Sequence, residues 1–91
     1  MFTNRVGTGN TARNNLVGLT IRDRRLKLRI SQRELADRLT VIGLDVDKNA
    51  VQRMEDGKRF ITDIEMTYLA NLFCTSVEAL ISESESILNT K

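Results

Sequence analysis

The 91-residue chain contains no proline, histidine or tryptophan, and its single cysteine is Cys74. Without a second thiol or an imidazole, Cys74 can form neither an internal disulfide nor a Cys/His metal site. The missing histidine also removes the commonest general base, which argues against a hydrolytic or proton-transfer enzyme. The sequence therefore predicts no enzymatic activity, no metal and no cofactor.

Long apolar runs are missing as well. No stretch approaches the roughly 18 apolar residues of a transmembrane helix, and the N-terminus lacks the apolar block of a secretory signal. A soluble, cytoplasmic protein without a membrane segment is expected. The 41% hydrophobic and 29% charged residues are an ordinary globular balance, and a chain of this length builds one small core.

Positive charge is concentrated in the front part of the chain. Residues 1–60 hold 13 of the 14 basic residues and seven of the 12 acids, a net charge of +6. Residues 61–91 hold one base and five acids, a net charge of −4. Uneven charge is common in small proteins, but a basic front half is also what phosphate binding requires.

The two ends of the chain differ in pattern from its middle. Residues 1–14 follow neither a helical nor a strand period and are expected to form a flexible N-terminal arm. One domain over residues 15–82 follows, and then an acidic tail over residues 83–91. From about residue 16 to 28, Val17, Ile21 and Leu28 recur at helical spacing among basic residues, which predicts a first, basic helix.

Two capping boxes mark the starts of further helices. Ser31 with Glu34 opens a second helix that should run to about residue 42, where Gly43 can take the left-handed position after the helix end. Thr62 with Glu65 opens a fourth helix in the same way. Its buried stripe is predicted to consist of Met66, Leu69, Ala70 and Phe73.

Single caps predict the remaining helices. Asp47 is a good N-cap for a third helix from residue 48 to about residue 56, which Gly57 ends. Ser76 caps a fifth, shorter helix. The Ser- and Glu-rich run after Ser82 indicates a solvated tail or a fraying helix. Because no strand or repeat pattern is found, the predicted fold class is all-α, with five short helices.

The outward face of the third helix combines basic and amide side chains. Val51 and Met54 face inward at a spacing of three, which leaves outward Lys48, Asn49, Gln52 and Arg53. Side chains of these types can read the edges of base pairs. They also fit the plain solvated face of any short helix, so this pattern alone leaves both interpretations open.

Other residues near this helix suit phosphate contacts. Gln32 is the first residue of the second helix, where its side chain and the free amides of the first turn can hold a phosphate. Lys58 and Arg59 follow the third helix and would add further contacts. These positions favour a DNA-binding surface.

Four groups of residues follow one another in an informative order. They are Ile21…Arg25, Ser31-Gln32-x-Glu34-Leu35-Ala36, Val51-x-Arg53-Met54-Glu55-x-Gly57-Lys58 and Leu69-Ala70…Ser76-Val77…Leu80. This order resembles the lambda-repressor-like helix-turn-helix family (Cro/repressor, XRE type) over about residues 16–82. The resemblance implies a compact five-helix domain that binds operator DNA, usually as a dimer, with the third helix in the major groove.

The resemblance also implies roles by position. Gln32 would contact a phosphate. The base-reading surface would consist of Asp47, Lys48, Asn49 and Gln52, with Arg53 at its edge. Arg25 and Glu55 would form a salt bridge between the first and third helices; alternatively, Arg25 is a further phosphate contact. Asp47 could accept a hydrogen bond from a cytosine amino group or only cap the helix.

Some features depart from the family pattern. The connection over residues 40–45 is longer than usual, as in a subset of the family whose fourth helix also starts with Thr-Asp-x-Glu. Arg29 and Cys74 stand where glycine is common at helix ends. Each must adopt the left-handed conformation at a cost of about 1 kcal/mol, or the cap differs.

The function that the resemblance implies is sequence-specific regulation, most simply by a repressor that binds a palindromic operator in double-stranded DNA as a homodimer. Arg5 and Arg13 could follow the minor groove, or the arm has no such role. A dimer patch could consist of Leu80, Ile81, Ile87 and Leu88, of which the first two fit the core equally well. The alternative function is a protein-interaction module such as the antitoxin of a toxin pair, which can also repress its own operon.

Overall fold

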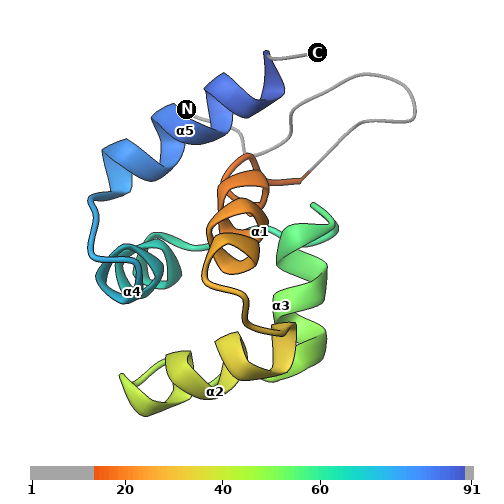
Figure 1. Cartoon of the computed structure of the whole chain (residues 1–91), viewed down its shortest axis with the longest axis vertical. Coiled ribbons are helices and arrows are strands. Elements are labelled where there is room, and N and C mark those ends of the chain that lie inside the picture. Colours follow the sequence, from red (N-terminus) through yellow and green to blue (C-terminus); the bar gives the residue numbers. More distant parts are fainter. Residues whose placement is uncertain (1–13, 90–91) are drawn as a thin grey trace.

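The computed structural model describes residues 14–89, which form five helices and contain no strand (Figure 1). They are α1 (Gly18–Lys27), α2 (Gln32–Val41), α3 (Lys48–Glu55), α4 (Asp63–Leu72) and α5 (Val77–Leu88). The predicted all-α, five-helix class is confirmed. None of these helices is long and apolar enough to cross a membrane. Arg5 and Arg13, with the proposed minor-groove role, lie outside the described residues.

Four of the five helices begin at the side-chain caps that the sequence predicts. The cap oxygen accepts a hydrogen bond from the backbone N–H three residues later in each case, with caps Ser31, Asp47, Thr62 and Ser76. The reciprocal half of the capping box forms in α4 but not in α2. Glu34 instead accepts a hydrogen bond from Arg38 one turn later, at 2.9 Å, because an ion pair at that spacing competes for the carboxylate.

Four of the helices are followed by a residue in the left-handed conformation. Gly43 and Gly57 follow α2 and α3 with φ of 116° and 74°. Arg29 and Cys74 follow α1 and α4 with φ of 60° and 55°, although each carries a side chain. The longer connection after α2 therefore starts from a glycine turn, in which the backbone N–H of Leu44 donates to the carbonyl of Leu39 at 2.9 Å.

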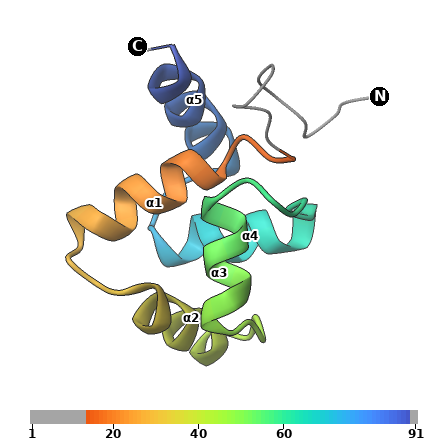
Figure 2. The ribbon, with the colours of Figure 1, turned by 90° about the vertical axis from the view of Figure 1, so that its right-hand side faces the viewer.

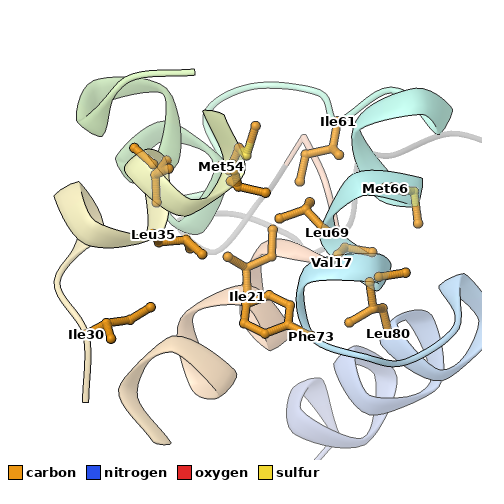
Figure 3. Packing of buried hydrophobic residues seen from close by; sticks show 14 residues of the cluster. Val17, Ile21, Ile30, Leu35, Met54, Ile61, Met66, Leu69, Phe73 and Leu80 are labelled. Atoms are coloured by element: carbon orange, nitrogen blue, oxygen red, sulfur yellow. The ribbon is translucent and has the colours of Figure 1, made fainter. Parts of the chain in front are cut away.

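All five helices contribute to one apolar core (Figure 3). Its completely buried members are Ile21, Leu35, Leu39, Val51, Met54, Leu69 and Leu80. The buried stripe predicted for α4 is confirmed at each of its positions. Helix α1 lies between the α2–α3 pair and α5, and it packs against both α3 and α5 (Figure 1). The core thus fixes the position of α3 relative to the rest of the domain.

The sequence leaves a solvated tail or a fraying helix open after Ser82, and the structure has a helix there, because α5 continues to Leu88. Ser84 is completely buried against α1, where its hydroxyl lies within hydrogen-bonding distance of the Thr20 hydroxyl. Small serine side chains let two helices approach closely. Glu83 extends the contact by a salt bridge to Arg24. This guanidinium holds the pKa of the Glu83 carboxyl below its usual range, chiefly through the hydrogen bond between them.

The packing of α5 removes two residues from the candidate dimer patch. Leu80 is completely buried and Ile81 is half-buried, so both belong to the core or its border. Leu88 is exposed near the end of α5. The sequence alone does not decide whether Leu80 and Ile81 belong to the core or to a dimer patch. The packing of α5 against α1 assigns both to the core or its border.

The start of the domain is attached to the end of α3 and to the segment after it. Asn14, which the sequence assigns to the arm, donates its backbone N–H to the carbonyl of Gly57 at 2.7 Å. The buried Asn15 side chain donates to the carbonyls of Met54 and Arg59, at 3.0 and 2.8 Å. Its Oδ1 accepts from the N–H of Gly18 at 2.7 Å and so satisfies the first turn of α1. This clamp was not predicted.

Candidate nucleic-acid interface

Helix α3 has one buried and one exposed face. Val51 and Met54 are completely buried, as their spacing predicts. The opposite face exposes Lys48, Asn49, Gln52 and Arg53. Helices α2 and α1 both pack against α3 and leave this face open, as Figure 2 shows. A single short helix therefore presents two amide and two cationic side chains together.

A buried salt bridge holds α3 in place on the buried side of this helix. Arg25 Nε donates to Glu55 Oε2 at 2.6 Å and Arg25 Nη2 donates to Oε1 at 3.0 Å. Arg25 Nη1 also donates to the carbonyl of Ile30 at 2.9 Å, just before α2 begins. The two charged residues are 8% and 4% exposed, so water screens them little. One guanidinium thus joins α1, the approach to α2 and the end of α3. The pairing is the one that the family resemblance implies.

Gln32, the first residue of α2, also contacts the salt bridge between Arg25 and Glu55. Its Nε2 donates to Glu55 Oε1 at 3.1 Å, and the side chain is half-buried. Since an amide nitrogen carries two hydrogens, one N–H of this group remains for another acceptor. The geometry therefore fixes where the Gln32 side chain lies, beside the end of α3.

Asp47 lies at the amino end of α3 and is exposed. Its Oδ1 accepts from the N–H of Ala50 at 2.8 Å, which is the capping role considered from the sequence. A shallow hollow of about 330 Å³ opens next to it, lined by Asp47, Asn49, Ala50, Arg53 and Arg59. The segment that follows α3 thus folds back beside the exposed face of this helix.

Lys58 and Arg59 differ in their surroundings. Lys58 is exposed, and no ion pair involves it within residues 14–89. Arg59 donates through Nη2 to Glu65 Oε2 at 2.7 Å, and its side chain is 28% exposed. The Glu65 carboxylate already compensates the Arg59 charge, which leaves Lys58 as the stronger candidate for a phosphate.

Ion pairing divides the cations of residues 14–89 into two groups. Five of them form salt bridges: Arg24, Arg25, Lys27, Arg38 and Arg59. The others, all exposed, form none: Arg22, Arg29, Arg33, Lys48, Arg53 and Lys58. Lys48, Arg53 and Lys58 lie on α3 or directly after it. Half of the six cations without an ion pair in this part of the chain therefore lie on α3 or directly after it.

Comparison with known proteins supports the architecture. No protein-family model matches the chain, and no curated protein is a significant match in sequence. Among solved structures, the clp gene regulator ClgR from C. glutamicum is similar, with a TM-score of 0.68 over 84% of this chain and 92% of that one. The fold is that of a known gene regulator. At 17% identity, the likeness concerns the fold alone.

Proposed function

We propose that this protein is a transcription regulator that binds a specific double-stranded DNA sequence through α3 and represses by occupying its operator. The observation that carries the proposal is the exposed face of α3, with Lys48, Asn49 and Gln52 side by side on it. Asparagine and glutamine can bond bidentately to adenine, and lysine to guanine or phosphate. The fold shared with the gene regulator ClgR supports a regulatory role.

The residues around α3 would hold the DNA backbone. Gln32 has one side-chain N–H left for a phosphate, and the first amides of α2 lie beside it. Arg53, in the last turn of α3, and Lys58, just after this helix, would add further contacts. Arg59 would add less, because Glu65 already pairs with it. We assign Asp47 to capping, since a carboxylate near phosphates is repelled by them.

We further propose that two copies bind a palindromic operator. Symmetric recognition helices enter successive major grooves, so the half-sites should lie about one helical turn apart. Each half-site would receive one α3. The proposal therefore predicts both a symmetric sequence and a stoichiometry of two chains per duplex.

Selection of binding sites from a pool of random duplexes tests this function. The wild-type chain should enrich one palindromic sequence, and footprinting should then map protection to it. A variant with Asn49 and Gln52 both replaced by alanine should enrich none. A wild-type chain that enriches no sequence would refute the proposal.

A partner protein is the second candidate, in line with the antitoxin alternative. The observation that favours it is the exposure of Phe60 and Ile64, at 55% and 69%, just before and within the first turn of α4. Phenylalanine is enriched in protein interfaces relative to the rest of the surface. The discriminating experiment is co-purification with the products of neighbouring reading frames, compared with the Phe60→Ser variant.

A further inference from the structure

Arg33 on α2 is exposed, and no ion pair involves it among residues 14–89. Arg38, five residues later on the same helix, is compensated by Glu34. Arg33 is the second residue of α2, where the helix dipole disfavours a cation. Neither an ion pair nor helix electrostatics therefore accounts for a positive charge at this position.

Helix α2, which carries Arg33, packs against α3 (Figure 2). Arg33 and Lys48 line the same hollow of about 310 Å³, although 15 positions separate them in the sequence. Asp37 and Asp47 also line it, but neither lies within ion-pair distance of either cation. Two cations from different helices, neither of them in an ion pair, thus line one hollow near the amino-terminal end of α3.

We propose that Arg33 binds a backbone phosphate beside the groove that α3 enters. This inference rests on the proposed function. A guanidinium presents a planar fork of donors that fits two phosphate oxygens at once. Arg33 lies on α2, next to Gln32 and off the exposed face of α3, and this position suits a phosphate better than a base edge. A contact there fixes the register of α3 on the duplex without reading sequence.

The test compares Arg33→Ala with Arg38→Ala in the full chain. Both changes remove one positive charge from exposed positions of α2, and thermal unfolding should confirm that both variants remain folded. The DNA probe is the duplex selected by the wild-type chain, titrated from about 50 to 300 mM salt. Arg33→Ala should bind about tenfold more weakly, and its log–log salt slope should be smaller by about 0.9. Arg38→Ala should match the wild type.

A second measurement identifies the ligand of Arg33. Single phosphates of the selected duplex are replaced by neutral methylphosphonates, one position at a time. One replacement should weaken the wild type about as much as Arg33→Ala does, and it should have no further effect on that variant. Arg33→Lys should restore the salt slope but only part of the affinity, because lysine lacks the fork.

The outcomes separate this inference from the function on which it rests. Equal affinities of Arg33→Ala and Arg38→Ala on a duplex that the wild type binds tightly would overturn the role of Arg33 and leave the regulator intact. A weaker Arg33→Ala without coupling to any phosphate would overturn the phosphate assignment. A wild-type chain that prefers no duplex would overturn both proposals.

Discussion

Arg25 donates to both carboxylate oxygens of Glu55, at 2.6 and 3.0 Å, and both residues are buried. The pair joins the first helix to the last residue of α3, and Gln32 adds a hydrogen bond to the same carboxylate. The exposed face of α3 is therefore supported by a charged contact on its buried side. Changes to that contact should affect both the stability of the fold and the position of the recognition helix.

Replacing Glu55 by alanine should lower the free energy of unfolding by about 3–5 kcal/mol, because it leaves the Arg25 guanidinium buried without its partner. Urea unfolding followed by circular dichroism measures this. The double variant Arg25→Met/Glu55→Leu should lose much less, since no unpaired charge remains. A single variant as stable as the wild type would contradict the burial of the pair.

Replacing Ser84 by leucine tests whether α5 packs on α1 beyond Ser82. The Ser84 side chain is completely buried beside Thr20, so a larger side chain should destabilise the domain by about 1–3 kcal/mol. Thermal unfolding should report a correspondingly lower Tm. Ser82→Leu is the control, because Ser82 is exposed and its replacement should change stability little. Equal Tm values for the two variants would mean that this segment is a tail after all.

The salt bridge between Arg24 and Glu83 predicts a dependence of stability on pH. Because the folded-state pKa of Glu83 is lowered, its contribution is present above the unfolded pKa of about 4.3 and is lost as the pH falls. Glu83→Gln should therefore be less stable than the wild type at pH 7, by less than about 1 kcal/mol, because the pair is partly exposed to water. The stabilities of the two proteins should converge as the pH falls through the lowered folded-state pKa of Glu83. A difference that persists unchanged in acid would contradict the ion pair.

Gly43 should not accept a side chain. Its φ of 116° is strained for any other residue, and an added Cβ would lie 3.3 Å from the Tyr68 ring. Gly43→Ala is expected to destabilise the domain by more than about 1 kcal/mol, measured by urea unfolding. Val41→Ala, at an exposed position of the same helix end, serves as the matched control. Unchanged stability in Gly43→Ala would show that the turn after α2 can adopt another conformation.

Local signals in the sequence predict most of this fold. Side-chain caps such as Asp47 and Ser76 depend on residues three positions away, and apolar spacing predicts the buried face of each helix. The sequence leaves the continuation of α5 open, because its buried residue is Ser84, which no hydrophobic pattern reveals. The clamp by Asn15 was not predicted because its partners lie about 40 positions away in the sequence, where a local pattern cannot reveal them.

The candidate site was predictable where it depends on one helix. The exposed face of α3 follows from the inward spacing of Val51 and Met54. The different surroundings of Arg59 and Arg33 depend on tertiary packing, which brings Glu65 to the first and Lys48 to the second. The sequence does not show which arginines form ion pairs in the folded protein. The predicted DNA-binding residues therefore included Arg59, which is paired, and omitted Arg33, which is not.

The affinities of Asn49→Ala and Lys58→Ala for the selected duplex and for a scrambled duplex test the central claim that α3 reads DNA. Asn49→Ala should weaken binding to the selected duplex by about 1–3 kcal/mol and leave the scrambled duplex unaffected, because a base contact is lost. Lys58→Ala should weaken both alike, as loss of a phosphate contact does. If Asn49→Ala affected the two duplexes equally, α3 would not be the element that recognises sequence.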